Sequence, residues 1–174
     1  SLATLDELSG GRLVVGAGVG WSEGEYGALD QEFGNRGARM DEALDIYRTV
    51  WTEDPSTFEG EHYRFRDIKL QPKPAHDIPI WIGGGSQPAY DRAVTRGDGF
   101  QAISTEPAEL ADIVASIRAA RPEPEFVVSY RTGWDPQGMD PGLIAEEAAA
   151  YAEAGVDHVV SAPWRRSADE WIAS

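Results

Sequence analysis

Three consecutive glycines that follow a short apolar run form the part of this sequence best suited to hold a ligand. Residues 78–82 are apolar, Gly83, Gly84 and Gly85 come next, and Ser86 precedes a helical segment with a proline in its first turn. Because glycine has no Cβ atom, backbone N–H groups in such a turn approach an oxyanion closely. Ser86 is expected to cap the helix, whose positive N-terminal end favours a phosphate. The motif predicts an anion site, and a tight turn that binds nothing remains the alternative.

Alternating glycines end a second apolar segment near the beginning of the chain. Residues 11–15 lead into Gly16, Gly18 and Gly20, and Trp21 follows. Side chains of a strand alternate between its two faces, so these glycines leave one face bare and open to a flat or bulky group. Trp21 would then form a wall of the same pocket. The alternative is that the glycines permit close packing inside a barrel wall.

The elements that position these motifs follow from an alternation of apolar and amphipathic segments. Strands are predicted at residues 13–19, 78–83, 99–104, 126–130 and 158–162. Helices are predicted at residues 36–51, 88–96, 107–120 and 141–154, with a terminal helix from Ser167 and a surface hairpin at residues 58–65. This order indicates an α/β fold with a parallel sheet. Such sheets bind ligands at the carboxyl ends of their strands, where both glycine motifs lie.

Both glycine motifs belong to a longer series of segments that resembles a known family. In order, these segments are LATLDELSGGR (2–12), GAGVGW (16–21), RGARMDE (36–42), WTEDP (51–55), FEG (58–60), QPKP (71–74), PIWIGGGS (79–86) and GDGF (97–100). Their order and spacing resemble the luciferase-like monooxygenase family, which includes bacterial luciferase and the coenzyme F420-dependent oxidoreductases. The resemblance is tight over residues 1–104 and looser beyond.

The resemblance implies a (β/α)8 barrel that binds FMN or the deazaflavin coenzyme F420. It assigns the cofactor phosphate to Gly83, Gly84, Gly85 and Ser86, and the edge of the flavin or deazaflavin ring to Gly18, Val19, Gly20 and Trp21. It implies hydride transfer with F420 or, with FMN and oxygen, formation of a flavin hydroperoxide. Members of the family place acids and bases on early strands that this chain lacks, so no catalytic residue is assigned.

Val19 bears on the choice of cofactor. Bacterial luciferase holds at the matching position an arginine that helps to bind the FMN phosphate, and valine removes that charge. The glycine-rich pattern resembles the F420-dependent branch more closely. F420-dependent hydride transfer is therefore the first prediction. FMN-dependent monooxygenation is the alternative, because several FMN users of the family also lack the arginine.

The length of the chain bears on how much of a barrel is present. Its 174 residues are enough for one domain but fall short of the ~250 residues of a closed eight-stranded barrel. The predicted fold is a single domain over residues 1–174, a partial TIM barrel with strands four to eight present and the N-terminal part missing. A fragment is expected ahead of a naturally shortened homologue. Five strands cannot close a barrel, which predicts two open edges, an uncovered apolar inner face and, as a result, aggregation, rearrangement or association.

Charge and composition narrow the range of partners. Thirty acidic against 15 basic residues give a formal net charge of −15, which argues against nucleic acid and anionic membranes. There is no cysteine, and His62, His76 and His158 lack a metal-like spacing, so no metal site is predicted. Glu146 and Glu147 are expected on a solvated helix face. No signal peptide or spanning segment is recognised, so a cytoplasmic location is expected. The resemblance implies a small-molecule substrate and a homo-oligomer.

Two functions of other classes stay open at this point. A partial barrel is compatible with a non-catalytic, truncated paralogue or subunit that pairs with another chain. A phosphate-binding barrel enzyme that acts on a phosphosugar would use the same glycine turn. The glycine-rich strand that ends in Trp21 makes the phosphosugar enzyme the least favoured of the three functions.

Overall fold

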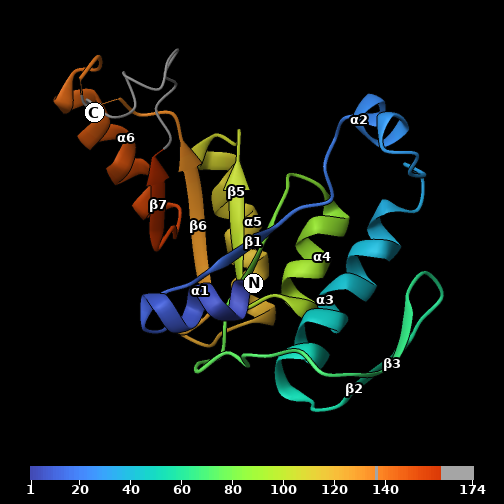
Figure 1. Ribbon diagram of the computed structural model, residues 1–174. Helices are drawn as coiled ribbons and strands as arrows, with labels where there is room; N and C mark the ends of the chain where they lie inside the picture. Colours follow the sequence, from blue (N-terminus) through green and yellow to red (C-terminus); the bar gives the residue numbers. More distant parts are fainter. Residues whose placement is uncertain (136, 162–174) are drawn as a thin grey trace. The chain divides into compact units, whose positions relative to one another are not determined.

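The computed structural model describes residues 1–135 and 137–161. The chain forms two compact units, Ser1–Ile80 and Trp81–Ser174, and the elements of each are labelled in Figure 1. The prediction of a single barrel domain over residues 1–174 stays a prediction. Ala162 and the predicted terminal helix from Ser167 lie outside the described residues.

The first unit contains one short strand, three helices and a hairpin. Its elements are α1 (Leu2–Ser9), β1 (Val15–Ala17), α2 (Glu23–Ala28), α3 (Arg36–Thr52), β2 (Ser56–Glu59) and β3 (Arg64–Ile68). The predicted helix at residues 36–51 and the predicted hairpin are confirmed, since β2 and β3 pair antiparallel with Phe58 opposite Phe65. The predicted strand at residues 13–19 is present but shorter.

Helix α2 was not predicted from the sequence. Gly24 and Gly27 have low helix propensity, so the sequence of this segment does not indicate a helix. Ser22 nevertheless caps the helix, because its Oγ accepts the N–H of Glu25 at 3.4 Å. Glu23 and Glu25 lie in the first turn, where carboxylates interact favourably with the positive end of the helix. Capping and charge outweigh the low propensity of two glycines.

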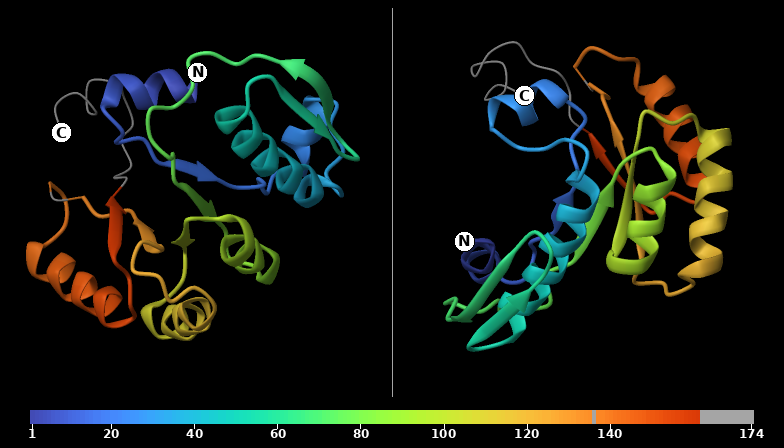
Figure 2. Two further views of the ribbon diagram at one scale, coloured as in Figure 1. Left: turned by 90° about the horizontal axis from the view of Figure 1, so that it is seen from below. Right: turned by 90° about the vertical axis from the view of Figure 1, so that its right-hand side faces the viewer.

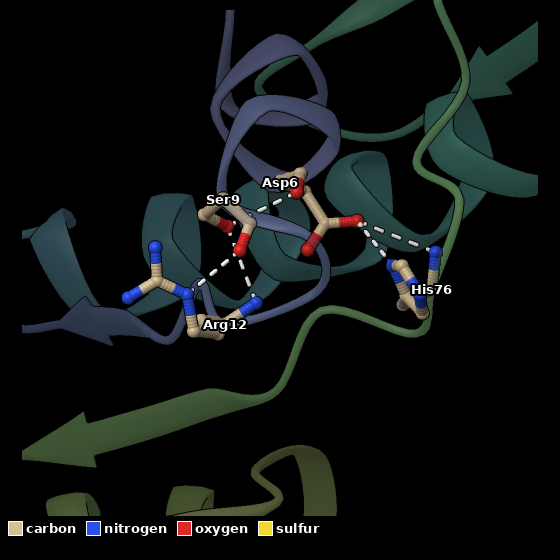
Figure 3. A network of polar contacts seen from close by, with 4 residues as sticks. All are labelled: Asp6, Ser9, Arg12 and His76. Atoms are coloured by element: carbon tan, nitrogen blue, oxygen red, sulfur yellow. Dashed lines mark hydrogen bonds and ion pairs between the residues drawn. The ribbon is translucent and has the colours of Figure 1, made fainter.

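The buried carboxylate of Asp6 connects α1 to the loop that contains His76, which precedes the strand beginning at Ile80, as Figure 3 shows. The side chain of Asp6 is 1% exposed, and its Oδ2 accepts the backbone N–H of His76 at 3.3 Å and lies 3.4 Å from His76 Nδ1. Ser9 Oγ donates to Asp6 O, and Arg12 Nε donates to Ser9 O at 2.7 Å. Gly11 has φ +78°, and a Cβ there would lie 2.6 Å from the His76 ring. These contacts fix the start of β1.

The hairpin is attached to α3 through Glu42. Its carboxylate accepts the backbone N–H groups of Glu61, His62 and Tyr63 at 2.7–3.1 Å. Burial opposes ionisation of Glu42, but these three donors together hold its pKa below the ordinary carboxyl value. The turn of the hairpin is therefore held by one charged side chain from the helix.

The second unit alternates strands and helices. Its elements are β4 (Ile80–Gly83), α4 (Gln87–Arg96), β5 (Gly99–Ile103), α5 (Pro107–Ala120), β6 (Val127–Thr132), α6 (Pro141–Glu153) and β7 (His158–Ser161). Strands β4 to β7 pair in parallel. In the first unit Val15 N donates to Pro79 O at 2.9 Å, and β1 completes a five-stranded sheet in the order β1-β4-β5-β6-β7. The predicted α/β fold and its five strands are confirmed.

Helices α4, α5 and α6 pack on one face of the β4–β7 strands, as Figure 2 shows. Phe100 and Tyr130 point to this face. Phe100 meets Tyr90 of α4 edge-on with ring centroids 5.3 Å apart, and Tyr130 stacks on Tyr151 of α6 at 4.0 Å. Val128 lies in register with Phe100 and is fully buried. This side of the sheet forms the core of the unit.

The opposite face of these strands is only partly the apolar surface that the sequence predicted. The strand register places Gln101, Ser129 and His158 side by side, with Arg131 one step nearer the carboxyl edge. Ser129 Oγ lies 3.1 Å from His158 Nδ1, and the ring of Trp81 meets His158 edge-on at 5.2 Å. This face mixes polar, aromatic and apolar groups, because Gln101, Ser129, Arg131 and His158 share it with the apolar side chains of Ile103, Val127 and Val160.

Candidate functional site

The glycine turn after β4 is shaped by its own helix. Gly84 has φ +151°, and a Cβ at this position would lie 2.7 Å from the Cβ of Ala89 in the first turns of α4. A Cβ at Gly85 would meet nothing within 4 Å. The turn therefore excludes a side chain at Gly84 because it lies against α4, whereas Gly85 faces open space.

Ser86 does not cap α4 in the way the sequence predicted. It occupies the N-cap position with φ −137°, but its hydroxyl makes no capping hydrogen bond. The Ser86 carbonyl accepts the N–H groups of Ala89 and Tyr90 instead, at 2.9 and 3.1 Å. Pro88 lies in the first turn, as predicted. The exposed hydroxyl of Ser86 is thus left for a ligand or for water.

The turn also presents backbone donors. In residues 1–135 and 137–161, no acceptor pairs with the N–H groups of Gly85, Ser86 or Gln87. The start of α4 carries the partial positive charge of the helix dipole at the same place. Three unpaired donors, an open glycine and a hydroxyl make this turn chemically suited to a phosphate oxyanion.

The second predicted segment lies at the end of β1 in the first unit. Gly20 has φ +75°, and Tyr26 Oη donates to the carbonyl of Val19 at 2.6 Å. Trp21 follows with 88% of its surface exposed. Tyr26 meets Phe33 edge-on at 5.3 Å. The sequence did not reveal Tyr26, because it lies on the unpredicted helix α2 and reaches back by seven residues.

The predicted cofactor residues thus form two separate groups. Residues 83–86 make one continuous turn in the second unit, and residues 18–21 make one continuous turn in the first unit. The first group has the donors and the space that an oxyanion requires. The second presents an exposed aromatic ring after a glycine with left-handed backbone. That both groups bind one cofactor stays a prediction.

Tyr130 in β6, Trp134 after β6 and Tyr151 in α6 form an aromatic cluster near the carboxyl end of β6. Tyr151 Oη donates to the carbonyl of Thr105 at 3.1 Å. Burial and the adjacent Tyr130 hydroxyl raise the pKa of Tyr151 above its usual value, so its phenol remains neutral at physiological pH. Trp134 Nε1 donates to Glu147 Oε2 at 2.6 Å. Glu147, predicted on a solvated face, is exposed but holds an indole in place.

All three histidines take part in hydrogen bonds within the protein. His76 is bonded to Asp6, His158 to Ser129, and the backbone of His62 to Glu42. The described part of the chain has no cluster of three or more histidine and acidic side chains placed to hold a metal ion. None of its helices combines the length and the apolar composition needed to cross a bilayer.

Two curated relatives show which enzymes the chain resembles in sequence. It is 36% identical over 115 residues to an F420-dependent glucose-6-phosphate dehydrogenase of Intrasporangium calvum, covering 63% of this chain and 34% of that protein. It is 37% identical over 102 residues to an FMNH2-dependent dimethylsulfone monooxygenase of Pseudomonas fluorescens, covering 57% of this chain and 28% of that protein. The matches thus span about a third of the length of these relatives.

Solved structures share the fold. An F420-dependent secondary alcohol dehydrogenase in complex with an F420-acetone adduct superposes with a TM-score of 0.80 at 18% identity, covering 92% of this chain and 66% of that one. The coenzyme F420-dependent tetrahydromethanopterin reductase of Methanopyrus kandleri gives 0.69 at 14% identity, with 91% and 70% covered. At sequence identities of 18% and 14%, the superpositions show a shared fold and nothing further. A model of the luciferase-like monooxygenase family matches residues 1–137, most of the sequence, and the chain therefore belongs to that family.

Proposed function

We propose that this chain forms the phosphate-binding part of an oxidoreductase that uses coenzyme F420 for hydride transfer. The observation that carries the proposal is the turn at residues 83–86, where Gly84 lies against Ala89 and three backbone N–H groups have no partner in the described residues. A Cβ at Gly84 would meet α4, whereas the space beside Gly85 is open to a ligand. The residues present therefore fit a cofactor phosphate.

Each group of residues has a defined task in this proposal. The N–H groups of Gly85, Ser86 and Gln87 donate to the phosphate, and the Ser86 hydroxyl adds a further donor. Trp21 borders the ring of the cofactor and shields it from water. The bound cofactor supplies the hydride chemistry, and the protein supplies position and electrostatics. The proposed partner is a small-molecule substrate, not nucleic acid, in keeping with the 30 acidic and 15 basic residues.

Val19 supports F420 over FMN, because the family resemblance implies an arginine at this position for binding the FMN phosphate, and valine lacks that charge. FMN remains the second candidate, since an FMNH2-dependent monooxygenase is as similar in sequence as an F420-dependent dehydrogenase. A homo-oligomer is proposed as the assembled form.

Titration of the purified chain with F420 and, separately, with FMN tests the proposal through cofactor fluorescence. We expect saturable binding with the lower dissociation constant for F420. Gly85→Asp should fold like the parent, since its Cβ meets nothing within 4 Å, but its carboxylate should weaken binding by at least about 10-fold. Ser116→Asp, at an exposed position of α5, is the matched control. A folded chain that binds neither cofactor, or equal affinities for parent and Gly85→Asp, would contradict the proposal.

A further inference from the structure

A row of residues crosses the face of the second unit's sheet that lies opposite α4, α5 and α6 (Figure 2). The strand register places four residues side by side in this row: Gly83, Gln101, Ser129 and His158. The row starts at the first glycine of the turn that holds the phosphate in the proposed function. It then crosses β5 and β6 and ends on β7, so a molecule bound on this face lies on the same sheet as the glycine turn.

The indole of Trp81 lies across the same face. Trp81 precedes Gly83 by two residues on β4, and residues two apart on a strand point to the same side. A Cβ at Gly99 would lie 2.6 Å from Trp81 Cδ1, so the ring rests directly on that glycine of β5. The ring also meets the imidazole of His158 on β7 edge-on, with centroids 5.2 Å apart. Trp81 is only half-buried, so its ring offers an aromatic surface to a planar group.

Ser129 fixes the orientation of the His158 ring. Ser129 is fully buried, and its Oγ lies 3.1 Å from His158 Nδ1. The hydroxyl has no other partner in the described residues, and a buried hydroxyl that donates to nothing is costly, so Nδ1 is the acceptor. The proton of the neutral imidazole is then on Nε2. His158 is exposed, and its Nε2–H has no partner in the part of the chain that the structure describes. It presents a fixed donor to this face.

Three further donors on this face are unpaired within residues 1–135 and 137–161: the indole N–H of Trp81, the amide of Gln101 and the guanidinium of Arg131. Arg131 follows Ser129 by two residues and so points to the same side of β6. The nitrogens of Trp81 and Gln101 are accessible, because neither is among the buried, unpaired polar atoms of the described residues. Four unpaired donors and one cation therefore share this face.

The charge of these strands favours an anion as the partner of the donors. Strands β4 to β7 contain no acidic residue, although the chain has 30. Arg118 and Arg121 of the same unit pair with Asp157 and Glu123, whereas Arg131 is exposed and pairs with no described residue. A planar guanidinium matches the two oxygens of a carboxylate.

We infer that this face of the sheet binds a small planar molecule that carries a carboxylate. The ring of the molecule packs against Trp81, and its carboxylate accepts from His158 Nε2 and from Arg131. The inference rests on the proposed function, because it assigns this molecule as the substrate of the proposed oxidoreductase. It adds a substrate class to a function for which only the cofactor was considered above.

Calorimetric titration of the purified chain with benzoate tests the inference. We expect saturable binding of benzoate, and binding at least about 10-fold weaker of neutral benzamide, which lacks the charge, and of acetate, which lacks the ring. Arg131→Gln and His158→Phe should each weaken benzoate binding by about 10-fold or more, as expected for loss of a charge-assisted hydrogen bond. Phenylalanine at position 158 keeps an aromatic ring beside Trp81 and removes only the donor.

Matched controls make the same changes elsewhere and should bind benzoate like the parent. Arg64→Gln removes an equally exposed arginine of β3. His62→Phe replaces a histidine of the hairpin, whose hydrogen bonds to Glu42 are made by its backbone.

Three results would overturn the inference: benzoate affinity that is unchanged in Arg131→Gln and His158→Phe, equal affinities for benzoate and benzamide, or no benzoate binding by a chain whose circular dichroism shows it folded. Titration of the same samples with F420 and FMN separates the two proposals. Cofactor binding without benzoate binding refutes the substrate site alone. Benzoate binding that depends on His158 and Arg131 in a chain that binds neither cofactor supports the site and refutes the proposed function.

Discussion

Gly84→Ala should destabilise the second unit, whereas Gly85→Ala should leave its stability nearly unchanged. The added methyl group at Gly84 would lie 2.7 Å from the Cβ of Ala89. Carbon atoms in contact are ordinarily about 3.5–4.0 Å apart, so the turn or α4 must move by about 1 Å. Forced overpacking of this kind costs about 1–3 kcal/mol. The backbone at φ +151° adds strain for any residue other than glycine.

Thermal and urea unfolding measure this effect. A loss of about 2 kcal/mol lowers the melting temperature of a chain of this size by about 4–8 °C. Gly85→Ala should remain within about 0.5 kcal/mol of the parent, because its Cβ meets nothing within 4 Å. Both variants add the same methyl group to neighbouring glycines, so their difference isolates the contact with α4.

A double-mutant cycle identifies the cause of the destabilisation. Ala89→Gly removes the opposing methyl group and by itself costs about 1 kcal/mol through lower helix propensity. Combined with Gly84→Ala, it should recover about 1 kcal/mol or more of the predicted loss. Equal stabilities of Gly84→Ala and Gly85→Ala, or a coupling energy near zero, would show that the turn does not lie against α4 as described.

Two further predictions concern titrating groups. Glu42→Gln should lower the unfolding midpoint in urea at pH 7 and flatten its decline in acid. The lowered pKa of Glu42 gives stability that is present above the ordinary value of 4.5 and lost as the pH falls through its folded value. Tyr151 has a raised pKa, so stability should fall as the pH rises above 10.0, where the unfolded phenol ionises first. Tyr151→Phe should reduce that fall in stability. Unfolding experiments measure the stability, and tyrosinate absorbance measures the ionisation of the phenols.

Matched variants separate these effects from general surface changes. Glu59→Gln removes an exposed carboxylate that pairs with Arg66, and it should change stability by less than about 1 kcal/mol at either pH. If the stability of Glu42→Gln declined in acid as steeply as that of the parent, the role given to the three backbone donors would be wrong. Ionisation of all tyrosines near the ordinary phenol pKa would contradict the burial of Tyr151.

Local sequence signals were sufficient for most of the elements. An apolar run that ends in glycine predicted β4, an apolar run that follows glycine predicted β5, and proline at a helix start marked α5 and α6. The hairpin followed from alternating residues around Gly60. Helix α2 was not predicted because it contains two glycines, which lower helix propensity. Its N-cap at Ser22 and the acidic residues of its first turn were the local signals for it. These features depend on neighbours within a few residues, which is why they can be predicted from sequence.

The sequence by itself determined the order of strands and helices, the two glycine motifs and the resemblance to the luciferase-like family. Only the tertiary structure decided that Ala89 excludes a side chain at Gly84, that the Ser86 hydroxyl makes no capping bond to α4, and that Glu147 holds Trp134. Periodicity and turn chemistry act over a few residues. Contacts between side chains of different elements depend instead on how strands and helices pack, and no local pattern encodes that packing.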